Sequence, residues 1–248
     1  MWNGFEIKEF EFEGKDAWIV FPYSDSAEDK KKIADADGRW LLKTEYWGAF
    51  PEVEIEMLNR GFHLVSVQNI SRFATEEDCE RKARLVKYIS DTYGLRDKCV
   101  TVGYSLGGAH AVNFAGFHPE CVSCIYLDAP VLNFCDYPGR MPSEECEGVW
   151  ENEFKYAYPG VSRAMLLNFA NHPMNKIPVL KEHKIPIVML YGTEDMSVNY
   201  NANGRLLEME YEGSDLLKVI PRQLQGHHPH GGLYDKSELI EFILKNSK

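Results

Sequence analysis

Cysteine is scarce in this chain, with six residues among 248. Small secreted domains that depend on disulfides carry a much higher proportion, so a disulfide scaffold is excluded. Residues 1–7 contain no basic segment followed by an apolar core, so the chain shows no sign of a secretory signal. We therefore expect reduced thiols and a cytoplasmic location.

Basic residues are outnumbered: 27 Lys and Arg stand against 38 Asp and Glu, a formal net charge of −11. Such a chain lacks the cationic surface that binds phosphate backbones, and anionic lipid surfaces would repel it. Long apolar runs are also missing, because the longest ones, such as 17–21 and 185–191, are too short to span a bilayer. The sequence therefore predicts no nucleic-acid partner and no membrane partner.

Repeats and low-complexity tracts are absent, and 44% hydrophobic residues with 26% charged residues are typical of a globular protein. Apolar runs expected to be strands alternate with segments of helical pattern. The expected strands are a hairpin over 5–12 and 17–21, then 63–67, 99–102, 122–127, 185–191 and 216–220. The expected helices are 51–60, 75–93, 106–118, 202–211 and 237–245. This alternation favours an α/β fold with a mostly parallel, doubly wound sheet flanked by helices on both faces. We expect one domain over 1–248, with 129–184 as a small cap insertion over the active site and one helix near 161–170.

The strongest motif is Gly103-Tyr104-Ser105-Leu106-Gly107, a G-x-S-x-G pattern between an expected strand and an Ala-rich expected helix. This is the setting of a nucleophile elbow, in which a strained turn exposes the serine hydroxyl above the sheet. Glycines at both ends allow the strand and the helix to approach closely. A phosphate-binding loop is disfavoured, because the glycine spacing differs and no lysine follows.

A nucleophilic serine needs a base, and the base needs an acid that orients it. Asp195 follows the expected strand 185–191, and His227 follows the next strand, so both should lie at the same sheet edge as Ser105. Two alternatives stay open: Asp128, which directly follows the strand 122–127, as the acid, and His228 as the base. The order Ser105, Asp195, His227 is the one we favour.

Three histidines lie close together in the chain, at His227, His228 and His230, and this invites a zinc interpretation. Pro229 interrupts any regular element there, so we expect one catalytic histidine and two structural ones. The sequence predicts no metal and no cofactor.

Together, the opening hairpin, the elbow, the acid in 191–195 and the late Gly226-His227 resemble the α/β-hydrolase superfamily over essentially the whole chain. The stretches 40–48, 128–131 and 226–230 are similar to bacterial esterase-like members linked to polysaccharide breakdown. The resemblance implies an oxyanion hole formed by the Leu106 N–H and by an N–H that follows the third strand. The resemblance places Pro22-Tyr23-Ser24 at that position, and because Pro22 has no N–H, the second donor is expected to be Tyr23 or Ser24.

The function implied is a serine esterase that hydrolyses a small-molecule ester through an acyl-enzyme. Aromatic and acidic side chains alternate over 134–158, where a lipase would present a continuous aliphatic face. We therefore expect short acyl groups, above all acetyl, on a carbohydrate or small polar alcohol, with Trp47 and Tyr104 contacting the substrate. A thioesterase, acyltransferase or peptidase of the same fold stays open as an alternative, as does an inactive binding module.

Overall fold

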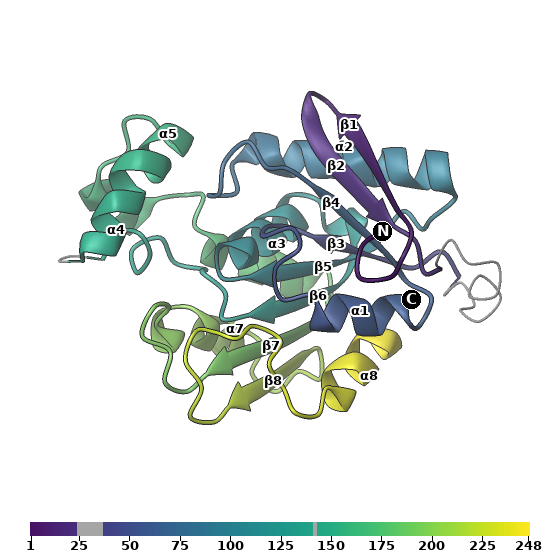
Figure 1. The fold of residues 1–248 in the computed structure, drawn as a ribbon. Helices are drawn as coiled ribbons and strands as arrows, with labels where there is room; N and C mark the ends of the chain where they lie inside the picture. The colour runs from purple at the N-terminus through teal and green to yellow at the C-terminus, as the bar shows by residue number, and fades with distance from the viewer. Residues whose placement is uncertain (24–36, 141–142) are drawn as a thin grey trace.

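The computed structural model describes residues 1–23, 37–140 and 143–248, and its strands there form one eight-stranded sheet in the order β1-β2-β4-β3-β5-β6-β7-β8 (Figure 1). The strands are β1 (Ile7–Phe12), β2 (Lys15–Val20), β3 (Trp40–Lys43), β4 (His63–Val67), β5 (Cys99–Tyr104), β6 (Val122–Asp128), β7 (Ile187–Gly192) and β8 (Leu217–Arg222). β2 runs antiparallel to both of its neighbours, and every pairing from β4 to β8 is parallel. The predicted mostly parallel, doubly wound sheet is therefore confirmed.

Helices cover both faces of this sheet (Figure 1). They are α1 (Glu52–Leu58), α2 (Glu76–Tyr93), α3 (Leu106–Phe117), α4 (Glu144–Val149), α5 (Lys155–Ala157), α6 (Ile177–Glu182), α7 (Gly204–Glu210) and α8 (Ser237–Asn246). Side chains of α1 and α8 share one apolar core with one sheet face, and those of α2, α3, α6 and α7 share another core with the opposite face. Over the described residues, none of the helices has the length and apolarity needed to cross a bilayer.

The central strand β3 is the one strand of the described sheet that the sequence did not predict. It lies between β4 and β5, and all four of its residues are buried. Its last residue is Lys43, whose ammonium pairs with the carboxylate of Glu54 at 2.6 Å, both side chains being almost completely buried. A four-residue strand that ends in a charged residue gives little hydrophobic periodicity, and this explains why it escaped the sequence pattern.

The segment 129–184 carries more helix than the sequence predicted. α4, a π-helical turn (Trp150–Phe154) and α5 stand away from the sheet (Figure 1), and a 3₁₀ helix (Arg163–Asn168) occupies the position of the expected helix. Phe134, Trp150 and Phe154 form a third apolar cluster with Leu106 at the start of α3. α6, by contrast, belongs to the helical layer beside α3. The part of 129–184 that stands away from the sheet is therefore shorter than the predicted insertion.

Candidate active site

Ser105 occupies the sharp turn between β5 and α3, with φ +50° and ψ −120°. Residues other than glycine rarely adopt a positive φ. Such backbone strain costs on the order of 1–3 kcal/mol and persists only where the surrounding structure enforces it. Here the Ser105 N–H donates to the carbonyl of Asp128 (3.0 Å), and the Ser105 carbonyl accepts from the N–H of Val131 (2.9 Å). A Cβ at Gly103 would lie 2.6 Å from the carbonyl oxygen of Gly107, so the turn requires glycine there. These constraints hold the serine at the carboxyl edge of the sheet.

The loops after β7 and β8 bring Asp195 and His227 to the same edge. His227 Nδ1 lies 2.8 Å from Asp195 Oδ2, and His227 Nε2 lies 3.0 Å from Ser105 Oγ. A carboxylate can only accept, so Nδ1 carries the proton, and in the neutral ring Nε2 then accepts from the Ser105 hydroxyl. The structure thus places the three residues favoured from the sequence in one hydrogen-bonded chain.

Asp195 is fixed by its own loop. Its Oδ1 accepts hydrogen bonds from the N–H groups of Ser197 and Val198, each at 2.9 Å. Burial raises the pKa of Asp195, but the hydrogen bonds from His227, Val198 and Ser197 outweigh burial and hold that pKa below its ordinary value. Asp195 is therefore ionised at neutral pH, which is the state that orients the imidazole.

Ser105 opens into a cavity of about 240 Å³, which we call the Ser105 cavity. Its walls come from the segment after β3, from the segment 129–184 and from the loop after β7. They include Tyr46, Phe50, Tyr137, Glu145 and Val198. Polar and apolar groups are mixed over these walls, and the volume is below the range of about 300–1,000 Å³ that is usual for drug-sized ligands.

Solved structures similar to this chain match it at low sequence identity. The esterase Pf2001 of Pyrococcus furiosus is 12% identical, with a TM-score of 0.66 over 98% of this chain and 94% of that one. A CIB-like hydrolase of Thermoplasma acidophilum is 9% identical, with a TM-score of 0.56 over 97% and 96% of the two chains. Dipeptidyl peptidase 4 of Porphyromonas gingivalis is 12% identical, with a TM-score of 0.68 over 99% of this chain.

The chain has the α/β-hydrolase fold. This chain spans 35% and 36% of the length of two of the peptidases that it matches. No protein-family model matches the sequence, and no curated protein matches it either.

Asp128 and His228, the alternative candidates for the acid and the base, make other contacts in the structure. Asp128 lies 2.8 Å from Arg222 Nη2 in a buried ion pair, accepts from the Gly231 N–H at 2.6 Å, and lies 3.2 Å from His230 Nδ1. The ring of His228 stacks on Phe50 with centroids 5.3 Å apart. Asp128 therefore braces the loop that carries the histidines, while Asp195 contacts His227 directly.

Removing the Asp128 carboxylate should destabilise the protein. Asp128→Ala leaves the Arg222 guanidinium buried without its partner, and we expect the free energy of unfolding to fall by about 3–5 kcal/mol. Urea denaturation followed by circular dichroism measures this change. The matched control is Asp215→Ala at an exposed position, for which the expected change is within about 0.5 kcal/mol. A loss below about 1 kcal/mol for Asp128→Ala would show that the pair contributes little.

The histidine cluster has a geometry that a metal could use, because ligand atoms of His227, His228 and His230 lie within 4.8 Å of one another. Both ring nitrogens of His227 are engaged by Asp195 and Ser105, and His230 Nδ1 lies within hydrogen-bonding distance of Asp128. A metal bound to His227 would have to break the contact with Ser105 or with Asp195. The observed arrangement fits acid–base chemistry at His227.

Neither of the two residues predicted to contact substrate lines the Ser105 cavity. The prediction for Tyr104 is wrong, because its side chain is only 2% exposed and its hydroxyl donates to Glu54 at 3.1 Å beneath the sheet edge. Trp47 does not line the Ser105 cavity but a neighbouring one. Sequence reasoning missed Arg72, which lines both cavities and belongs to no recognisable motif.

The predicted second oxyanion donor also needs correction. β2 is antiparallel to β4, with Val20 opposite Leu64, so its carboxyl end and Tyr23 lie at the sheet edge opposite Ser105. Tyr23 accepts there from the Glu6 N–H at 2.8 Å, and Ser24 lies outside the described residues. The third strand in chain order is β3, and the segment that leaves it at the Ser105 edge begins with Thr44.

Proposed function

We propose that this chain is a serine hydrolase that cleaves carboxylic esters through an acyl-enzyme. The observation that carries the proposal is the hydrogen-bonded chain from Ser105 Oγ through His227 to Asp195, with contacts of 3.0 and 2.8 Å. Its intact geometry weighs against an inactive binding module, which has no need of an oriented imidazole.

The mechanism follows from the protonation states of these groups. Ser105 Oγ attacks the ester carbonyl while His227 Nε2 takes its proton, and ionised Asp195 stabilises the imidazolium that forms. The imidazolium returns the proton to the departing alcohol, which leaves an acyl group on Ser105. Water then attacks the acyl-enzyme, with His227 as base, and releases the carboxylic acid and free Ser105.

The negative oxygen of the tetrahedral intermediate needs N–H donors aimed at it. One is the N–H of Leu106, the first residue of α3, which has no acceptor within its own helix. We assign the second to Glu45 in place of Tyr23 or Ser24. Thr44 anchors this segment, since its N–H donates to Val102 (3.1 Å) and its hydroxyl lies 2.8 Å from the carbonyl of Gly107. The Glu45 main chain is thereby held against the first turn of α3.

Two observations favour short acyl esters of polar alcohols as substrates. The Ser105 cavity is small and its walls alternate between aromatic, acidic and hydroxyl groups, as shown by Tyr137, Glu145 and Ser197. One similar structure is described as an esterase that covers nearly the same length of chain. A peptidase activity is the second candidate, because another similar structure is a dipeptidyl peptidase, although this chain spans only 36% of it.

A substrate series tests the proposal. With p-nitrophenyl esters of two to twelve carbons, we expect kcat/KM to peak at two to four carbons, because the Ser105 cavity lacks room for a long chain. A second comparison separates the esterase from the peptidase. An esterase should release acetate from an acetylated oligosaccharide, whereas a peptidase should cleave aminoacyl p-nitroanilides. A peak at eight carbons or longer, or faster cleavage of the anilides, would overturn the assignment.

A further inference from the structure

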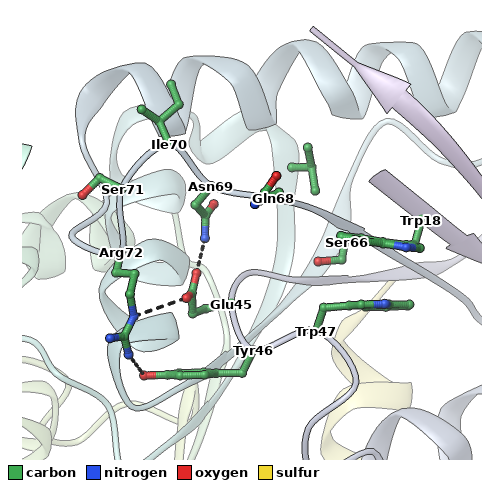
Figure 2. A pocket seen from close by; sticks show the side chains of 11 residues that line it. Trp18, Glu45, Tyr46, Trp47, Ser66, Gln68, Asn69, Ile70, Ser71 and Arg72 are labelled. Atoms are coloured by element: carbon green, nitrogen blue, oxygen red, sulfur yellow. Dashed lines mark hydrogen bonds and ion pairs between the residues drawn. The ribbon is translucent and has the colours of Figure 1, made fainter. Parts of the chain in front are cut away.

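A second cavity of about 310 Å³ lies beside the Ser105 cavity, at the carboxyl ends of β3 and β4, and we call it the Trp18 cavity (Figure 2). The two cavities share Tyr46 and Arg72. Arg72 Nη2 donates to the Tyr46 hydroxyl at 2.8 Å, and this bond fixes the tyrosine between them. A ligand in the Trp18 cavity would therefore meet the Ser105 cavity at Tyr46.

One wall of the Trp18 cavity is aromatic. The indoles of Trp18 and Trp47 stack nearly parallel, with centroids 5.1 Å apart and planes at 12° (Figure 2). Trp2 stacks on Trp47 at 5.6 Å without lining the cavity. β2 holds Trp18 rigidly, because this residue pairs with Ser66 of β4. The wall is thus a pre-formed apolar surface that a ring can contact without ordering a flexible side chain.

The two charged side chains that line this cavity, Glu45 and Arg72, pair with each other. Glu45 lies 3.5 Å from Arg72 Nε and also accepts from the side-chain amide of Asn69 (Figure 2). Asn69 in turn donates to the Thr44 carbonyl at 2.7 Å. Arg72 also pairs with Glu153 at 3.0 Å, so its charge is already matched by carboxylates and the cavity offers an anionic ligand no unpaired cation among its lining residues.

Gln68 supplies a free polar group at this site. Its side chain lines the Trp18 cavity and is exposed, and in the part of the chain that the structure describes its amide forms no hydrogen bond. An amide offers two donor hydrogens and an acceptor oxygen. Such a group matches hydroxyls, which also both donate and accept.

We infer that the Trp18 cavity binds the alcohol part of the ester, a neutral hydroxyl-bearing ring of the size of one sugar unit. The inference rests on the proposed esterase function. The apolar C–H groups of such a ring would contact the indoles of Trp18 and Trp47, and its hydroxyls would bond Gln68 and Glu45. The ester group, carried on the side of the ring that faces Tyr46, would then enter the Ser105 cavity.

Paired substrates test this assignment. The probes are a monoacetylated methyl glucoside and p-nitrophenyl acetate, and the measured quantity is the ratio of their kcat/KM values. Trp18→Ala should lower the ratio about tenfold, and Gln68→Ala about fivefold, the loss of about one hydrogen bond. The matched controls are Trp2→Ala, which disturbs the same aromatic stack outside the cavity, and Gln223→Ala at another exposed position. Both controls should leave the ratio unchanged within twofold.

The outcomes separate this inference from the proposed function. If the parent protein cleaves both esters and neither Trp18→Ala nor Gln68→Ala changes the ratio, the cavity assignment is wrong and the esterase function stands. If the parent cleaves neither ester, the proposed function fails. The cavity is then tested alone, by titrating Ser105→Ala protein with methyl glucoside and following tryptophan fluorescence. A saturable change that Gln68→Ala weakens supports the site, and no change overturns it.

Discussion

Replacing Ser105 with alanine should abolish hydrolysis, with kcat for p-nitrophenyl acetate falling by about 10⁶-fold, the loss typical of a removed nucleophile. The hydroxyl lies 3.0 Å from His227 Nε2 and opens into the Ser105 cavity, so it carries chemistry and little packing. Covalent labelling by a fluorophosphonate probe should disappear together with the activity. The midpoint of thermal unfolding should stay within a few degrees of the parent value.

Ser197→Ala is the matched control for this experiment. Ser197 lines the same cavity, but its contact with Asp195 uses the backbone N–H, which alanine keeps. We expect this variant to retain kcat within about threefold and to be labelled normally. More than about 1% of parental kcat in Ser105→Ala would mean that another group is the nucleophile.

The residues that sequence reasoning placed correctly are those whose positions follow from local rules. Ser105 sits in a motif whose glycines and flanking elements define the turn without reference to the rest of the chain. Asp195 and His227 follow consecutive parallel strands, whose carboxyl ends share one sheet edge. Local geometry and strand direction therefore predicted this part of the site.

The residues placed wrongly depend on contacts that are distant in sequence. β3 is recognisable only once Lys43 is seen paired with Glu54 in α1, because an unpaired buried lysine would argue against a strand. Without β3, no expected strand ended next to Thr44, and the second oxyanion donor was assigned to Tyr23 or Ser24, which follow the opening hairpin. Tyr104 adjoins Ser105 in sequence, but it ends a strand whose side chains alternate between faces, so it points toward Glu54.

Replacing His227 with alanine should reduce kcat about as much as loss of the serine, by about 10⁶-fold, because the two residues act as one unit. His227 is the imidazole that contacts both Ser105 and Asp195, at 3.0 and 2.8 Å. Steady-state kinetics with p-nitrophenyl acetate measure the loss. The double variant Ser105→Ala/His227→Ala should have the same kcat as either single variant, because each substitution alone already removes the proton transfer.

His228→Ala is the comparison that decides between the neighbouring histidines. Its ring stacks on Phe50 and is nearly perpendicular to that of His227, with ring planes at 74°, so its removal alters a cavity wall but no proton path. We expect kcat to fall less than tenfold. If His228→Ala were inactive while His227→Ala kept its activity, the base would be His228 and the hydrogen-bonded chain through His227 would have no catalytic role. If both variants lost activity equally, the loop's packing, rather than either imidazole, would be the feature that the reaction requires.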